Sequence, residues 1–599
     1  MKNRKFIFLI LLVSLFFNFY FISAAECGSV PVKGCTVSVS TTFNAGTYFF
    51  NGTSTSDPII TISGNNLRLD CNGAHFKGNS TTYGRGIYVN QAQNVSIVNC
   101  YIEGYYRGIY IRGFSKNITL DNLGSYNAGS GVYTDNSNKI YVINSNITLS
   151  SKGIYVLNTS ELSISTTIFK NDSYSIYLNS SSNGIIQDND ISDGLRDGTT
   201  YADIAIEESN FTKILDNTIN NGGYRGIYLN NYAEHSEVAG NIINGSYQDA
   251  IALYNGADYN EVHDNFFTSS NNNGISMRSS NSHFYNNLID KNTHHGMDLR
   301  ADVYTFGADN NTVENNIFSN QVESHFIYIT QGRNNIIKDN QFINQSGASD
   351  VQDGVEISNL SNGNKIIGNT FVNIHRYGIQ FIYGTKENVV QDNDFSKSTT
   401  NYTYFFVNST NDSIKFLGES YYINTSKEFR GWINESAKQI NNTYTKSQNL
   451  SIYGLTDAKL SYDNGTTSEK DGDVEITFLP YQFFVIIDKF YSPVVQNNLG
   501  PNSGGSDEGS GGSDTNPPNI SETNESIINQ DGNTTKNNSL ENKTNETTDS
   551  TEIIATLNSQ MIGKVLFWGG GTLIIIILIA LIIFPFLKIK SPKIKEEHL

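Results

Sequence analysis

A four-residue motif recurs along most of the chain, usually at steps of 22 to 24 residues. It runs from Gly86-Ile87-Tyr88-Val89 to Gly378-Ile379-Gln380-Phe381, and apolar and variable positions alternate within it, as in a strand with one buried face. An asparagine flanked by apolar residues repeats in step with the motif, at Asn189, Asn217, Asn241, Asn265, Asn287, Asn316, Asn340, Asn369 and Asn393. A unit of this size cannot bury a core alone, so the repeat predicts a solenoid whose stacked copies share one core.

The repeat length selects among solenoids. A leucine-rich horseshoe needs a Leu/Asn signature and helical stretches, which are missing, and propeller blades need about 40 residues or more. We therefore expect an all-β chain whose centre is a parallel β-helix, with one coil per repeat over residues 61–410. Some fourteen coils stacked at about 4.8 Å would form a rod of about 60–70 Å. The net charge of −18 argues against nucleic-acid binding, which needs a basic surface.

The repeat motifs also carry a family resemblance. Together with Leu69-Asp70-Cys71-Asn72-Gly73, the Gly-Ile-x-Val and Asn-x-Ile motifs resemble right-handed parallel β-helix proteins of the carbohydrate-binding and sugar-hydrolysing type. That group includes the periplasmic protein of nitrous-oxide-reductase maturation and many archaeal surface proteins. The resemblance covers about residues 61–406 and implies a right-handed, single-stranded β-helix, glycan chemistry and an archaeal cell surface. Signatures of β-helix pectinases and alginate epimerases (paired Asp, Gly-His-Gly, Asp-Pro-His-Asp) are missing, so no activity is transferred.

The two ends of the chain predict export and anchoring. Residues 1–25 combine basic, apolar and small residues in the order of a secretory signal peptide, although an uncleaved anchor is the alternative. Residues 562–587 predict a transmembrane helix, and four lysines in 588–599 place that tail in the cytoplasm. We expect a single-pass cell-surface protein with an extracellular N-terminal region and a cytoplasmic C-terminus.

The remaining segments flank the repeat. We expect an N-terminal cap over residues 26–60 and a β-rich cap or small β-domain over 411–495. Residues 496–561 read as a disordered linker, because they lack apolar periodicity. Its Asn-x-Ser/Thr sequons are candidate glycosylation sites, although an Asn-rich chain produces many by chance: Asn519, Asn524, Asn533 and Asn542. Four cysteines in an exported chain predict two disulfides, and we favour Cys27 with Cys35 and Cys71 with Cys100.

The variable position of the motif forms one outward-facing column. In the first half the column is a ladder of five tyrosines, which could stack on sugar rings or a partner protein, or could simply stabilise the sheet. These candidate binding residues are Tyr88, Tyr110, Tyr133, Tyr155 and Tyr177. In the second half the column changes to small and acidic residues, including Asp298 and Glu356.

Charged and histidine side chains gather around that change. We expect Asp298, Glu356 and His295 as candidate catalytic residues, with Asp298 and Glu356 two coils apart, about 10 Å at the backbone. Longer repeats at about 192–201, 300–309 and 345–352 would raise loops around them. Candidate binding residues are Asp249, Arg278, His294, Arg300, His325, Asp353 and Arg376. The alternative is that these polar side chains face solvent and have no functional role.

Two functions follow from these features. We favour a non-catalytic surface module that binds glycans or neighbouring surface proteins, or forms part of the cell envelope. The alternative is a polysaccharide-processing enzyme, a glycoside hydrolase, lyase or epimerase, whose acids, histidines and arginines act on sugar. We expect no cofactor and single out no metal ligands, since Met is only 4 and copper has poor support; calcium on turn oxygens is the one exception considered.

Overall fold

The computed structural model describes residues 25–488, except 80, 197–200, 302–306, 347–351, 399–401, 417–418, 420, 426–428, 435–437, 443–447, 465–466 and 479. Throughout these residues the regular elements are strands, from β1 (Cys35–Val37) to β53 (Phe483–Asp488). No helix in this part of the chain could cross a membrane. The predicted signal peptide (apart from Ala25), linker, sequons, transmembrane helix and tail lie outside it.

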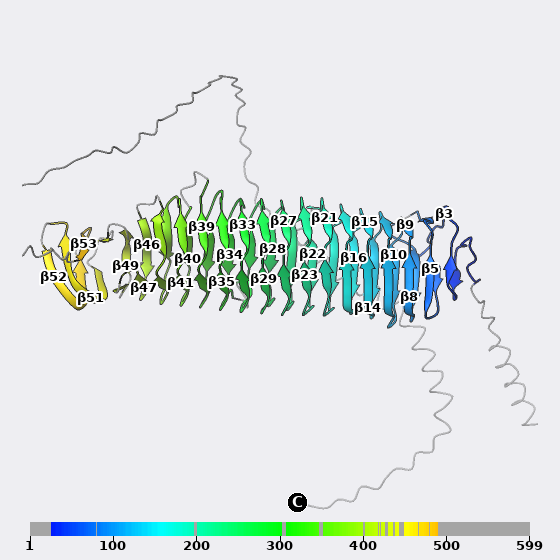
Figure 1. Ribbon diagram of the computed structural model, residues 1–599, viewed down its shortest axis with the longest axis horizontal. Helices are drawn as coiled ribbons and strands as arrows, with labels where there is room; N and C mark the ends of the chain where they lie inside the picture. The colour runs from blue at the N-terminus through cyan, green and yellow to red at the C-terminus, as the bar shows by residue number, and fades with distance from the viewer. Residues whose placement is uncertain are drawn as a thin grey trace, which may run out of the picture. The chain divides into compact units, whose positions relative to one another are not determined.

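Each coil of the repeat contains three strands. A representative coil is β7 (Arg85–Asn90), β8 (Gln93–Val98) and β9 (Tyr101–Glu103), and the next is β10 (Arg107–Arg112), β11 (Lys116–Asp121) and β12 (Gly124–Tyr126). β10 pairs with β7 in parallel, β11 with β8, and β12 with β9. Figure 1 shows the resulting rows of arrows, in which corresponding strands of successive coils lie side by side along the solenoid. The predicted parallel β-helix is confirmed.

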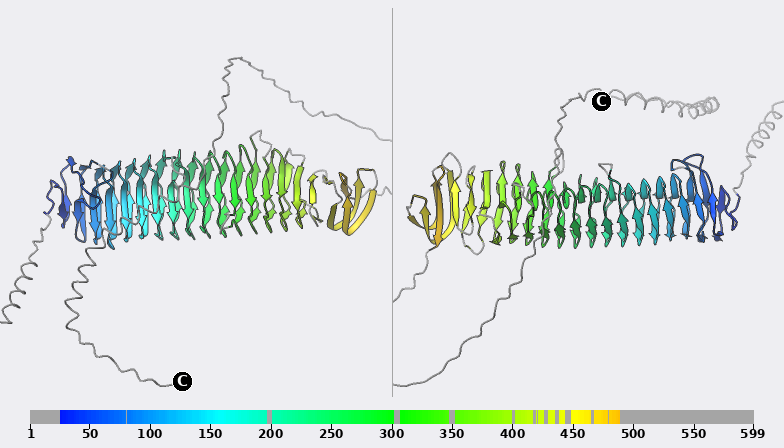
Figure 2. Two further views of the ribbon diagram at one scale, coloured as in Figure 1. Left: turned by 180° about the vertical axis from the view of Figure 1, so that it is seen from behind. Right: turned by 90° about the horizontal axis from the view of Figure 1, so that it is seen from above.

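The solenoid begins earlier than expected. A 15-stranded sheet runs from β3 (Thr47–Phe49) to β45 (Asp394–Lys397) with one strand per coil, so there are fifteen coils instead of about fourteen. The extra coil lies in the segment expected to be a cap, because β1 and β3 pair in parallel with β4 (Pro58–Ile62) and β6 (His75–Lys77). Both views in Figure 2 show this N-terminal end continuing the stack.

The inward residues form one continuous core. Ile87, Ile109 and Val132 occupy the same register and are at most 1% exposed, as the alternating pattern predicts. The glycine before each apolar residue has a steric reason. A Cβ on Gly108 would lie 2.5 Å from the carbonyl oxygen of Gly131 on the next coil. Larger side chains are therefore excluded wherever neighbouring coils approach this closely.

The repeated asparagines form a buried ladder at one corner of the coil. Asn265 Nδ2 donates to Asn287 Oδ1 at 3.0 Å and to the backbone carbonyls of Val238 and His263, both at 2.8 Å. Its own Oδ1 accepts from the backbone N–H of Asn241 at 2.9 Å. A buried corner whose backbone curves away from the strands keeps its polar groups paired in this way.

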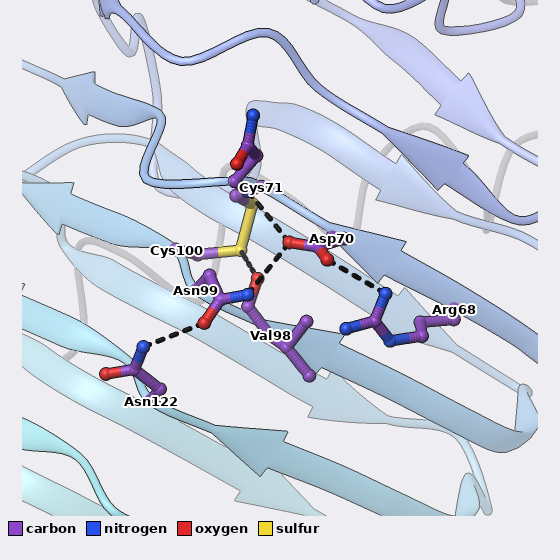
Figure 3. The surroundings of a disulfide bond; sticks show 8 residues. Arg68, Asp70, Cys71, Val98, Asn99, Cys100 and Asn122 are labelled. Carbon is purple, nitrogen blue, oxygen red and sulfur yellow. Dashed lines mark hydrogen bonds and ion pairs between the residues drawn. A yellow bond between two sulfur atoms is a disulfide. The ribbon is translucent and has the colours of Figure 1, made fainter.

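Both favoured disulfides are confirmed. Cys27 pairs with Cys35, and Cys71 pairs with Cys100. Figure 3 shows the second bridge beside a polar chain on adjacent coils. In that chain Asn122 Nδ2 donates to Asn99 Oδ1 at 2.7 Å, and Asn99 Nδ2 donates to Asp70 Oδ1 at 3.0 Å.

The parallel stacking ends near residue 415. β46 (Tyr402–Ser409) and β47 (Ser413–Lys415) still pair in parallel with the coil before them. The strands that follow pair antiparallel, and β49 (Phe429–Asn434) lies against β46. Two of them are long, β51 (Gln448–Tyr462) and β52 (Thr467–Phe478), and they pair with each other. The described residues of this segment are therefore mainly in strands outside the parallel stack, while its role as a cap or a small β-domain stays a prediction.

Candidate functional site

The outward column has the register predicted from the sequence. Ser276 on β31 (Ile275–Met277) pairs with Asp298 on β34 (Met297–Arg300), and Asp298 pairs with Tyr328 on β37 (Ile327–Thr330). Tyr328 in turn pairs with Glu356 on β40 (Val355–Ser358). Asp298 and Glu356 are therefore two coils apart, with the Tyr328 ring on the coil between them. Figure 1 labels β34 and β40 within this row of the solenoid.

The tyrosine ladder exists, and its rings are buried or half-buried. Tyr110 and Tyr133 are only 3% and 9% exposed, and successive rings from Tyr110 to Tyr155 meet edge to face at 77° and 90°. Cations occupy the ring faces: Arg107 lies 4.2 Å and 3.9 Å from the centroids of Tyr110 and Tyr133, and Lys152 lies 3.6 Å from Tyr155. Cation–π pairs of this kind stabilise a sheet face. The faces of these rings are therefore in contact with neighbouring cations and with one another.

Asp298 is a buried carboxylate with one free oxygen. Its Oδ2 pairs with Arg300 Nη2 at 3.1 Å, while Oδ1 has no hydrogen-bond partner among the described residues. Burial raises the pKa of Asp298 to about 6, and the Arg300 guanidinium opposes that rise. Near neutral pH this group can therefore both hold and release a proton.

Two arginines lie on adjacent coils beside Asp298. Arg278 and Arg300 directly follow Met277 and Leu299, which are paired in register. The Nε atoms of both arginines are buried and have no hydrogen-bond partner in the described part of the chain. Arg278 lies 4.6 Å from the Tyr254 ring and Arg300 lies 5.6 Å from the Tyr328 ring. Asp298 pairs with Arg300, and Arg278 adds a second positive charge on the neighbouring coil at this point of an acidic protein.

Histidine and tyrosine rings connect Asp298 to Glu356. The His295 ring is nearly parallel to the His325 and Tyr328 rings, at centroid distances of 5.4 Å and 4.9 Å, and His294 contacts His295 at 3.9 Å. Burial holds the pKa of His295 well below its ordinary value, so this imidazole is neutral. Its Nδ1 has no hydrogen-bond partner among the residues that are described.

Asp353 is the centre of a second charged group. Both of its oxygens accept from Arg376, at 2.8 Å and 2.6 Å, and Oδ1 also accepts from the backbone N–H of Tyr377 at 3.1 Å. Its own backbone N–H donates to His325 Nδ1 at 3.2 Å. The proton of His325 is therefore on Nε2, which lies 3.1 Å from Glu356 Oε2. Burial raises the pKa of Asp353, and the bonds from Arg376 oppose that rise.

The same residues resemble a metal site in composition. His325, Asp353 and Glu356 each place a donor atom within 4.8 Å of the others, a grouping that sequence reasoning had not made. Arg376 already engages both Asp353 oxygens, and His325 Nδ1 accepts from the backbone. We therefore assign the trio to charge pairing. The expectation of calcium at turn oxygens stays a prediction.

The predicted residues thus fall into three groups. Asp298, Arg300, Arg278, His294 and His295 lie together, and His325, Asp353, Glu356 and Arg376 continue from them through stacked rings. Asp249 is 1% exposed and is held by Asn272, Asn273 and Arg225, so it faces other protein groups. Tyr328 and Tyr254 join the site without having been predicted as binding residues. The central parts of the three long repeats, 197–200, 302–306 and 347–351, lie outside the described residues.

Comparison with known proteins identifies the scaffold. The sequence profile of a family described as a right-handed β-helix region matches residues 20–166, 125–267 and 264–395. Among solved structures, a mutant of the periplasmic alginate epimerase AlgG shares 17% identity at a TM-score of 0.38, covering 52% of this chain and 78% of that one. An alginate lyase complexed with a trisaccharide shares 13% identity at 0.37, covering 55% and 80%. A search of curated protein sequences found no match.

A phage protein shows a similar level of likeness. A double mutant of the tailspike protein of the E. coli bacteriophage HK620, in a complex with a pentasaccharide, shares 12% identity at a TM-score of 0.37, covering 75% of this chain and 87% of the tailspike. Similarities this low transfer no residue role to the chain, so the site has to be understood from its own side chains.

Proposed function

The chain belongs to the right-handed β-helix family, and on this scaffold we propose that the Asp298 cluster binds an acidic polysaccharide. The observation that carries the proposal is the pair Arg278 and Arg300, each with a buried Nε that lacks a hydrogen-bond partner among the described residues. A buried donor without a partner costs about 1–3 kcal/mol, and native proteins retain few of them. A carboxylate of a sugar acid would accept from both guanidiniums.

The scaffold suits this role because it is rigid where the arginines lie. β31 and β34 are held in parallel pairing, and their inward residues Met277 and Leu299 are 0% exposed. The arginines extend from these strand ends, and the Arg300 side chain remains 40% exposed while Asp298 beneath it is 6% exposed. A site whose buried charge is fixed and whose outer charge is accessible can receive an anion without reorganising the sheet.

Asp298 supports a second candidate function, proton transfer to or from the bound sugar. A uronate lyase or epimerase needs a cation that neutralises the sugar carboxylate and a group that exchanges a proton at the neighbouring carbon. Arg278 and Arg300 supply the first, and Asp298, with a pKa of about 6, supplies the second. Glycoside hydrolysis fits less well, because Glu356 is paired with His325 and the Tyr328 ring lies on the coil between the two carboxylates.

A binding experiment tests the main proposal. Isothermal titration with a hexamer of galacturonic acid is compared with a neutral hexasaccharide, at two salt concentrations. We expect only the acidic ligand to bind, more weakly at high salt, and the double variant Arg278→Gln/Arg300→Gln to lose at least tenfold in affinity. Arg107→Gln in the tyrosine ladder is the matched control and should bind normally. Equal binding by the double variant would exclude this site.

Measuring product formation distinguishes binding alone from catalysis. Wild type and Asp298→Asn are incubated with the acidic polymer, and products are followed by ultraviolet absorbance for unsaturated ends and by NMR for epimerised sugars. Proton-transfer catalysis predicts product with wild type only, while both proteins bind. Absence of product with wild type, at concentrations that saturate binding, would leave a binding module.

The terminal segments support a location for this activity. We propose that the chain is exported, carries a glycosylated linker after a C-terminal β cap and is anchored by residues 562–587, which would present the β-helix outside the cell. Protease treatment of intact cells would release the described region if this is correct.

A further inference from the structure

A strip of three aromatic side chains lies on a turn of the solenoid, outside the charged cluster. Phe211, His235 and Tyr259 occupy the same turn position on successive coils, just before β23 (Lys213–Leu215), β26 (Glu237–Ala239) and β29 (Glu261–His263). The backbone N–H of Phe211 donates to the carbonyl of Glu234, and that of His235 to the carbonyl of Asp258, which fixes the register. We propose that this aromatic strip is a second carbohydrate-binding site, for a neutral glycan.

The backbone at these positions is unfavourable for the residues that occupy it. Phe211, His235 and Tyr259 have φ angles of 57°, 54° and 58°, in the left-handed region that bulky side chains rarely adopt. On most other coils the same position holds residues that tolerate this region better: Asn66, Asn94, Asn117, Asn183, Asn281, Asn310, Asn334 and Gly363. Lys139, Glu161 and Glu387 also replace asparagine at this position, but only Phe211, His235 and Tyr259 place aromatic rings there among the described coils, on three consecutive coils. Such a run of strained aromatic residues indicates a role that compensates the strain.

The strip also differs from the tyrosine ladder in exposure and geometry. Phe211 and Tyr259 are 55% and 51% exposed, and His235 between them is exposed as well. The three rings are nearly parallel, with interplanar angles of 9° and 12° at centroid distances of 5.3 Å and 5.1 Å. Parallel rings at this spacing are offset-stacked, so each ring leaves only part of one face and its outer edge open to solvent. The strip therefore offers apolar contacts that repeat at about the length of one pyranose residue.

Charge near the strip determines which glycan fits. Glu234 and Asp258 directly precede His235 and Tyr259 in the chain, and Glu237 and Glu261 follow on the adjoining strands. Lys213 pairs with Glu237 at 2.6 Å, so the acidic groups still outnumber the basic one beside the strip. Carboxylates accept hydrogen bonds from sugar hydroxyls but repel sugar acids. The strip therefore favours a neutral glycan, in contrast to the arginines of the charged cluster, and the proposal does not depend on catalysis or binding there.

The test uses variants that relieve the unfavourable backbone conformation at the three positions. In the triple variant Phe211→Asn/His235→Asn/Tyr259→Asn each residue becomes the one that most other coils use. We expect its melting temperature to rise by about 2 to 4 °C, while binding falls at least tenfold. The probes are cellohexaose, mannohexaose and maltohexaose, measured by isothermal titration and by NMR line broadening of the sugar. Tyr383→Asn is the matched control, since Tyr383 has a φ of 60° and is 61% exposed but lies on another turn. It should gain stability and bind normally.

Three results would overturn the proposal. One is unchanged binding, or none, of all three hexasaccharides when wild type and triple variant are compared. Another is a lower melting temperature for the triple variant, which would make the rings a structural stack. The third is binding of tetramethylammonium in place of sugars, which would indicate a cation site. Asp298→Asn is measured in parallel and should bind the neutral probe normally, so failure of the charged site cannot be mistaken for failure of the strip.

Discussion

One outward column passes through two regions with different chemistry. From Tyr88 to Tyr177 it carries tyrosines whose rings are contacted by Arg85, Arg107 and Lys152. From Ser276 to Gln380 it carries mostly buried polar and charged groups, and Asp298 Oδ1 in the column and the Nε atoms of Arg278 and Arg300 beside it lack hydrogen-bond partners among the described residues. The scaffold and register are the same, so the difference lies in the side chains alone. A self-satisfied column stabilises the solenoid, whereas an incompletely satisfied one is where a ligand is expected.

The buried corner of the coil also differs between the two regions in how fully it is hydrogen-bonded. In the first region the corner uses residues such as Leu123, Ser145 and Thr167, and Ser145 Oγ contacts Leu123 N–H at 3.2 Å. In the second region it uses asparagines, each of which bonds to both neighbouring coils and to backbone carbonyls. The more densely hydrogen-bonded corner therefore supports the region that carries the charged cluster.

Removing Asp353 should have the largest effect on the charged region. Asp353→Ala would remove the buried carboxylate that accepts from Arg376, at a cost of about 3–5 kcal/mol in the free energy of unfolding. Urea denaturation measures this loss. Hydrogen exchange should place it in the coils around β37 and β43 (Tyr377–Ile382), and an effect below 1 kcal/mol would contradict the pairing described here.

Asp203 lies between the two regions and predicts a pH effect. Its side chain occupies the motif's glycine column, its Oδ2 accepts from the Gly223 N–H at 2.9 Å, and burial raises its pKa from 3.8 to about 7. A raised carboxyl pKa means that the folded state binds the proton more tightly, so stability falls as pH rises from about 4 to 7. In Asp203→Asn, the free energy of unfolding should decrease over this pH range by about 2–4 kcal/mol less than in the wild type. Denaturation at pH 4 and pH 8 measures it, and identical pH profiles for both proteins would refute the assignment.

Corner residues allow a matched comparison between the regions. Asn316→Ala removes bonds to Phe284 O, Glu314 O and Asn340 and should cost about 3 kcal/mol. Ser145→Ala removes two bonds to its own coil and its neighbour and should cost about 1 kcal/mol. Both are read from denaturation midpoints. Equal losses would show that the asparagine corner contributes no additional stability.

The smallest effect is expected in the tyrosine ladder. Tyr155→Phe keeps the ring that contacts Lys152 and removes only the hydroxyl, so stability should change by less than about 0.5 kcal/mol. Binding of the acidic hexasaccharide should not change either. A clear loss of binding would indicate that the tyrosine ladder contacts the ligand.

The sequence predicts the fold well because its signal is repeated. Each coil restates the alternation of Gly86-Ile87-Tyr88-Val89, so register, inward faces and the Asp298 to Glu356 separation follow from it. Details that depend on single residues do not follow from the repeat. That Arg107 would cover Tyr110, that Asp353 would hold Arg376 and His325, and that Phe211 would lie at a left-handed turn depend on side-chain rotamers and turn geometry. The turn position was nevertheless detectable, because asparagine usually fills it.

A structure of the protein with an acidic hexasaccharide tests the central contrast most directly. We predict a sugar carboxylate within hydrogen-bonding distance of Arg278 and Arg300, close to the free oxygen of Asp298, and no sugar over the rings from Tyr110 to Tyr155. Sugar bound along the tyrosine ladder, with both arginines unchanged, would contradict it.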